Sequence, residues 1–146
     1  MNDDKVPDKD HIARLCLPSK IEDEKIQASA FMLRKDEKEL SVNWLEFLNC
    51  TDRDDEISEI RNVYSAKFTV SKTAKLAVLN VGELRMKIAE ESPDHRTLEV
   101  VHTPIISSGP DLGDPSHSEI YNLMPDNELI AELILQTIQQ TYPARA

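Results

Sequence analysis

The sequence predicts a protein of the α+β class, in which a mostly antiparallel sheet of about five strands carries two main helices packed on one face. Short apolar runs of strand length recur along the chain, and two longer segments space their apolar residues as amphipathic helices do. The elements follow in the order strand, hairpin, helix, strand, uncertain element, strand, loop and helix. This order is typical of a mixed fold rather than of a parallel sheet.

The chain begins with ten mostly polar residues that contain four aspartates and two lysines. We expect residues 1–10 to be a disordered lead-in, because they offer almost nothing to bury. Residues 11–146 are expected to fold as a single α+β domain, since this length suits one hydrophobic core. Residues 11–17 alternate well enough for a first strand, which Pro18 ends.

A hairpin is predicted in the next part of the chain. Residues 28–34 form an apolar run of strand length, and residues 40–44 alternate cleanly, with Leu40, Val42 and Trp44 on one face. A charged connection of five residues separates the two runs, which is a common length for a hairpin. We therefore expect the two segments to pair with each other.

The middle of the chain predicts a helix, a buried strand and a second strand. Residues 51–67 begin with acidic residues, which the helix dipole favours, and continue with one apolar stripe. Residues 74–81 form an apolar run that suits the middle of a sheet. Residues 83–91 are compatible with helix or strand, and their helix-forming composition favours a short helix. Residues 98–101 contain the β-branched residues of a strand.

The last helix is expected to start at an Asp126 cap and to run about 16 residues to Pro143. Its apolar residues are Leu129, Ile130, Leu133, Ile134 and Ile138. This face is broad, so core packing is one use for it and contact with a second copy or a partner is another.

Composition excludes several classes of function. The formal net charge is −10 at pH 7, which argues against nucleic-acid binding and against attraction to an anionic membrane surface. The acidic balance fits a protein that meets a basic partner, or one that meets no charged partner at all. No phosphate-binding glycine loop and no familiar hydrolase, metalloprotease or kinase motif is present, so no cofactor is predicted.

The expected compartment is the cytoplasm. The chain starts with charged residues and shows no apolar core of a secretory signal, and no apolar run is long enough to span a bilayer. Cys16 and Cys50 form no CxxC motif and lie in or beside apolar segments, so we expect free thiols in a reducing environment.

One candidate site stands out, at the end of the strand 98–101 and in the loop 107–119. Proline and glycine mark this loop as turns, and polar groups at strand ends are where a rigid scaffold builds sites. The candidate residues are His102, Asp114, Ser116, His117 and Glu119.

Several roles are open for these residues. They can be purely structural, with Asp114 or Ser116 bonding backbone amides in a turn. They can hold a metal ion, since histidine and carboxylate ligands are present. Without a metal, Ser116 can act with a histidine base that Asp114 or Glu119 orients. Fold analogy adds ADP-ribosyl transfer, for which His11 and Glu119 are the available residues.

The strings SAFMLRKDEKELSVNWLEF (residues 29–47) and DPSHSEIYNL (residues 114–123) carry a resemblance. They are similar to LSVNWLE-like and DPSHxxIxxL-like stretches in small uncharacterised bacterial proteins. The resemblance implies a bacterial cytoplasmic protein, an accessory component encoded beside larger partners. It implies no catalytic residue.

Two functional hypotheses follow. The first is a small acidic cytoplasmic binding module that acts through a protein partner, supported by the charge, the broad last helix and the lack of a strong catalytic motif. The second is a small hydrolase or transferase that uses His102 and the Asp114–Glu119 loop, with or without a metal. Histidine rings that converge on Asp114 in a cleft favour the enzyme, whereas rings held elsewhere favour the module.

Overall fold

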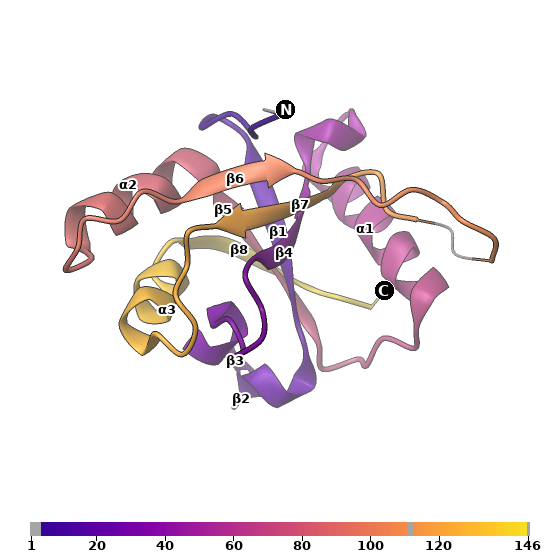
Figure 1. The fold of residues 1–146 in the computed structure, drawn as a ribbon. Coiled ribbons are helices and arrows are strands. Elements are labelled where there is room, and N and C mark those ends of the chain that lie inside the picture. The colour runs from indigo at the N-terminus through magenta and orange to yellow at the C-terminus, as the bar shows by residue number, and fades with distance from the viewer. Residues whose placement is uncertain (1–3, 111–112, 146) are drawn as a thin grey trace.

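A computed structural model describes residues 4–110 and 113–145. Within these residues one antiparallel sheet of six strands has the order β6-β7-β4-β1-β5-β8 (Figure 1). Its strands are β1 (His11–Cys16), β4 (Leu40–Trp44), β5 (Lys75–Asn80), β6 (Glu99–His102), β7 (His117–Tyr121) and β8 (Ile138–Pro143). A small second sheet pairs β2 (Ile21–Glu22) with β3 (Lys25–Ile26). The helices are α1 (Arg53–Lys67), α2 (Val81–Glu91) and α3 (Glu128–Leu135). The α+β class and the mostly antiparallel sheet are therefore confirmed.

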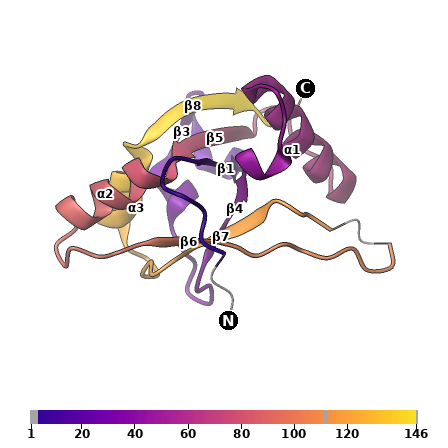
Figure 2. The same ribbon diagram turned by 90° about the horizontal axis from the view of Figure 1, so that it is seen from above.

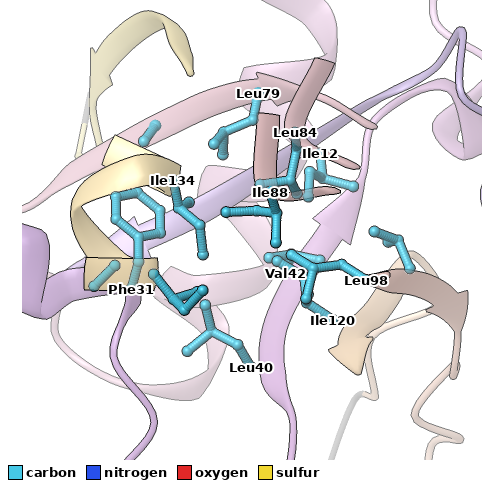
Figure 3. Close-up of a cluster of buried hydrophobic side chains, with 14 of the residues drawn as sticks. Ile12, Phe31, Leu40, Val42, Leu79, Leu84, Ile88, Leu98, Ile120 and Ile134 are labelled. Atoms are coloured by element: carbon cyan, nitrogen blue, oxygen red, sulfur yellow. The ribbon is translucent and has the colours of Figure 1, made fainter. Parts of the chain in front are cut away.

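Helices cover both faces of the large sheet. On one face α2 and α3 pack side by side and close the larger core (Figures 1 and 2), which contains Leu79, Leu84 and Ile134 (Figure 3). On the other face α1 places Ile57 and Ile60 in a second core. The two main helices predicted from the sequence thus lie on opposite faces rather than on one. The cause is β5, whose consecutive side chains are apolar and need cover on both sides.

The N-terminal segment is part of the sheet rather than a disordered lead-in. The Val6 amide donates to the Val100 carbonyl at 2.8 Å, and Lys5 forms a bridge with Val101, so this segment lies along the outer edge of β6. The Val6 side chain is buried in the larger core. The expectation is wrong for these residues because one apolar side chain and an unpaired strand edge are enough to order the segment. Residues 1–3 lie outside the described residues.

The predicted strand at 28–34 is also wrong, and with it the hairpin. Residues Ala28–Phe31 form a short 3₁₀ helix (η2) instead. Further 3₁₀ helices in the described part of the chain are η1 (Pro18–Lys20) and η3 (Glu46–Leu48). Phe31 and Leu33 insert into the larger core, where Phe31 lies near Ile134 of α3 (Figure 3). The apolar run therefore fills space between elements, and β4 pairs with β1 and β7.

The predicted last helix divides into α3 and β8. The α3 cap is Asn127, whose side chain accepts from the Ile130 amide at 3.0 Å, whereas Asp126 has a left-handed backbone. The helix ends at Leu135, and Ile138–Pro143 pairs with β5 instead of continuing it. Pairing of this segment with the free side of β5 satisfies the backbone hydrogen-bonding groups of both strands. This stabilises the protein more than continuing the helix would. The core buries Ile130, Ala131, Leu133 and Ile134 of α3, whereas Leu129 is 48% exposed. Contact of this helix with a second copy stays a prediction.

Other predicted elements are found where expected. The helix at 51–67 begins at an Asp52 cap, and the segment 83–91 belongs to α2, whose cap is the Asn80 side chain bonded to the Glu83 amide at 2.8 Å. Among the described residues no helix is long and apolar enough to cross a membrane.

Candidate functional site

The candidate residues lie at one end of the large sheet, where β4 and β6 finish and β7 begins (Figure 1). The ladder pairs Asn43 with His117 and His102 with Ser118. This antiparallel pairing brings the end of β6 and the start of β7 together with the end of β4, so sequence-distant polar residues become neighbours.

Asp114 and Ser116 are buried, and both are bonded to Asn43. Their exposed fractions are 2% and 0%, and that of Asn43 is 0%. The Asn43 Nδ2 atom lies 3.0 Å and 2.9 Å from the two carboxylate oxygens of Asp114 and 2.9 Å from Ser116 Oγ. Ser116 Oγ also donates to Asp114 Oδ1 at 3.3 Å. The Asp114 carboxylate and the Ser116 hydroxyl are therefore used inside the protein, and their main partner is a side chain rather than backbone amides.

Tyr64 of α1 completes this buried network. Its hydroxyl donates to Asn43 Oδ1 at 2.7 Å, which leaves Asn43 Nδ2 to donate to Asp114 and Ser116. Burial raises the pKa of Tyr64, and the nearby Asp114 charge raises it further. Tyr64 thus stays a neutral donor and ties α1 to the sheet through one continuous chain of hydrogen bonds.

The two predicted histidines are held by backbone carbonyls. His102 Nε2 lies 2.7 Å from the Pro115 oxygen, and His117 Nδ1 lies 2.8 Å from the Thr103 oxygen. A carbonyl only accepts, so these nitrogens carry the protons. His117 Nε2 is 3.2 Å from the Ser41 hydroxyl. Neither ring is bonded to Asp114 or Ser116, so the structure does not assemble the predicted base–nucleophile arrangement.

The residues of the remaining enzymatic arrangements are bonded to other partners. Glu119 accepts from the Tyr121 hydroxyl at 3.3 Å and takes no part in the buried network. His11, the other residue considered for ADP-ribosyl transfer, is held by Glu46, whose Oε2 lies 2.6 Å from His11 Nδ1. Within residues 4–110 and 113–145, no three His, Cys, Asp or Glu side chains are arranged to hold a metal ion.

An aromatic cluster lies beside the network and was missed by sequence reasoning. We define the aromatic surface as Trp44, Phe47 and His102. Phe47 is 4.5 Å from His102 and 5.6 Å from Trp44 between ring centroids, and Trp44 meets His102 edge-on at 5.2 Å. Phe47 is 41% exposed. The three rings thus form a continuous, partly exposed patch.

Hydrogen bonds fix the position of this surface. Trp44 Nε1 donates to Asp10 Oδ2 at 2.9 Å, and His102 is held by the Pro115 carbonyl. Asp10 itself is buried, at the end of the N-terminal segment. Two of the three rings therefore have a polar tip bonded to a fixed partner, which limits their rotation.

Of the segment between β6 and β7, residues 103–110 and 113–116 are described, and they project away from the body of the protein (Figures 1 and 2). The base of this segment is closed by two backbone hydrogen bonds between Ile105 and Asp114, at 3.0 Å and 2.9 Å. Gly113 has φ of +74°, and a Cβ there would lie 2.6 Å from the Ile105 oxygen, so glycine is required. Part of the predicted loop, residues 111–112, lies outside the described residues.

No protein-family model matches the chain, and searches of curated proteins and of solved structures found no match. A functional assignment therefore depends on the geometry of the molecule. That geometry gives a buried polar network made of Asn43, Tyr64, Asp114 and Ser116, and beside it the aromatic surface.

Proposed function

We propose that the protein is a small non-catalytic binding module that acts through a protein partner, which it contacts with the aromatic surface. The observation that carries this proposal is the cluster of Trp44, Phe47 and His102, whose rings touch one another while Phe47 remains 41% exposed. Large aromatic side chains that reach the surface on a fixed support are the residues that most often dominate binding energy.

The buried network supports binding rather than catalysis. A nucleophile or base must reach the substrate, but Ser116 and Asp114 are 0% and 2% exposed. Their hydrogen-bonding groups are used by Asn43 and by each other. The network instead holds β4 and the start of β7 in place, and these flank the aromatic surface.

Preorganisation is the physical benefit of this arrangement. A binding surface loses affinity when its side chains must be ordered as the partner arrives. Here Trp44 is fixed by Asp10 and His102 by the Pro115 carbonyl before any partner binds. The rings therefore need little further ordering, and more of the contact energy contributes to affinity.

The acidic charge of the chain favours a basic partner. The chain has a net charge of −10 at pH 7, and Glu46, half-buried and paired with His11, belongs to the same short η3 element as Phe47. Lysine and arginine side chains gain both from the faces of aromatic rings and from steering by negative charge. The free thiols of Cys16 and Cys50 support a reducing, cytoplasmic location for this encounter.

The proposal is tested by capture of partners from the native host with the tagged wild-type protein, a Phe47→Ala variant and a Met86→Ala variant. Met86 is 63% exposed on α2 and serves as the matched control. We expect a protein that the wild type and Met86→Ala retain equally and that Phe47→Ala loses, with products of neighbouring genes examined first. Equal capture by all three variants, or hydrolytic turnover that Ser116→Ala abolishes, would contradict the proposal.

A further inference from the structure

A cleft opens where β1 and β4 separate, away from the aromatic surface. β1 pairs with β4 at Ile12–Trp44 and Ala13–Asn43, whereas it stays paired with β5 as far as Cys16. After Ala13 the two strands diverge, and the space between them is a cleft of about 420 Å³. This volume is within the range of small-molecule binding sites.

Arg14 follows Ala13, at the point where β1 and β4 separate. Its Nε donates to the Ala30 carbonyl at 3.0 Å and its Nη1 donates to the Ser41 carbonyl at 2.8 Å. Arg14 lines the cleft, and these two bonds use two of the five N–H donors of its guanidinium. Burial lowers the pKa of Arg14, because buried surroundings disfavour the charged form. An anion in the cleft would compensate that cost with a charge-assisted bond to the guanidinium.

The cleft is positive although the protein is acidic. Lys20 and Arg34 line it together with Arg14, and two carboxylates, Glu37 and Asp126, line it as well. The lining therefore carries one net positive charge. Across residues 4–110 and 113–145, none of the three cations forms a salt bridge with a carboxylate. The electrostatic balance fits a ligand with one negative charge.

Apolar side chains form the rest of the wall. Leu17 and Phe68 line the cleft and are 42% and 44% exposed, and Met32, which packs against the larger core, lines it as well. Covering exposed leucine and phenylalanine with a ligand is favourable, because it removes apolar surface from water. A ligand with a charged end at Arg14 and an apolar body against these apolar side chains would satisfy both parts of the cleft.

We propose that this cleft is a binding site for a small amphipathic monocarboxylate, held by the Arg14 guanidinium with Lys20 and Arg34 beside it. The site does not depend on the aromatic surface or on the protein partner. The carboxylate accepts from Arg14 while the apolar part covers Leu17 and Phe68. A dianionic phosphate fits less well, because Glu37 and Asp126 reduce the positive charge of the lining.

The test is an amide NMR titration of the full chain with 3-phenylpropanoate. The amide analogue, 3-phenylpropanamide, has the same shape without the charge, and phenyl phosphate supplies the dianion. Arg14 itself supports the fold through two backbone carbonyls, so the variant is the double substitution Lys20→Gln and Arg34→Gln. Lys35→Gln is the control, since Lys35 is exposed next to Arg34 but does not line the cleft.

We expect saturable shifts at amides around the cleft with 3-phenylpropanoate, and no comparable shifts with the amide analogue. The double variant should weaken this binding about tenfold, since two nearby charges are lost, and Lys35→Gln should leave it nearly unchanged. Four results would each overturn the inference: no saturation, equal binding of the amide analogue, tighter binding of phenyl phosphate, or equal affinity in the double variant and the wild type.

Discussion

Replacing Asn43 by alanine removes the centre of the buried network. The change takes away the donor that serves Asp114 and Ser116 and the acceptor that serves Tyr64. A buried polar group left without a partner costs about 1–3 kcal/mol, and more when it is charged. The Asp114 carboxylate is 2% exposed, so the loss of its hydrogen-bond partner accounts for most of the destabilisation. We expect Asn43→Ala to lower the free energy of unfolding by about 3–5 kcal/mol.

Urea denaturation at pH 7 and 25 °C measures this loss, with a thermal melt as a second readout. A loss of that size lowers the melting temperature of a chain this long by about 10 °C or more. Asn62→Ala is the matched control, because Asn62 is exposed on α1 and its replacement should change stability by less than about 0.5 kcal/mol. If Asn43→Ala destabilised the protein no more than Asn62→Ala, the polar residues could not form the closed network described here.

The remaining predictions concern titration, thiol reactivity and the projecting loop. The pKa of Tyr64 is raised in the folded state, so the Tyr64 hydroxyl ionises first in the unfolded state as the pH rises. Its contribution to the stability of the folded state is therefore complete below about pH 10 and is lost above that pH. Tyr64→Phe should therefore reduce the steepness with which stability falls in urea titrations above that pH, and an unchanged slope would show that the hydroxyl is solvated. Burial raises the pKa of Cys16 to about 11, so a thiol reagent at pH 7 should label half-buried Cys50 first and Cys16 only on unfolding; simultaneous labelling counts against the core packing. Gly113→Ala should cost about 1–3 kcal/mol in a thermal melt, because its Cβ would meet the Ile105 carbonyl at 2.6 Å, and a wild-type melting curve would exclude the described turn.

Local sequence patterns predicted the elements for which the tertiary contacts agree with the local preference. The apolar run of β5 and the capped, striped segment of α1 are buried as their sequences indicate. The pattern failed where tertiary contacts decide. Residues after Leu135 continue a helical spacing, but the unpaired side of β5 recruits Ile138–Pro143 as a strand. Residues 28–34 have the composition of a strand, but the segment instead places the Phe31 side chain in the larger core.

Two of the predicted residues, Asp114 and Ser116, meet in one buried network, but the residue at its centre, Asn43, was missed. Asn43 lies between Val42 and Trp44, and strict alternation assigns it to a solvent-facing side. Helix α1 covers the side of β4 that Asn43 faces and brings Tyr64 into contact with it. Nothing in the sequence of β4 itself indicates that a helix covers this side. The available signal was Asn43 itself, a single amide in the apolar stretch that continues to Leu45. A polar residue in such a stretch needs a dedicated partner. The partners, Asp114 and Ser116, were found from their turn chemistry alone.

The central claim is that the polar residues of this site form a closed buried scaffold for the aromatic surface. Hydrogen exchange of side-chain amides by NMR tests it most directly, by comparing the Nδ2 protons of Asn43 with those of exposed Asn62. We predict that the Asn43 protons, bonded to Asp114 and Ser116, exchange orders of magnitude more slowly than those of Asn62. Equal exchange rates for the two residues would contradict the claim, because they would place Asn43 and its partners in contact with water.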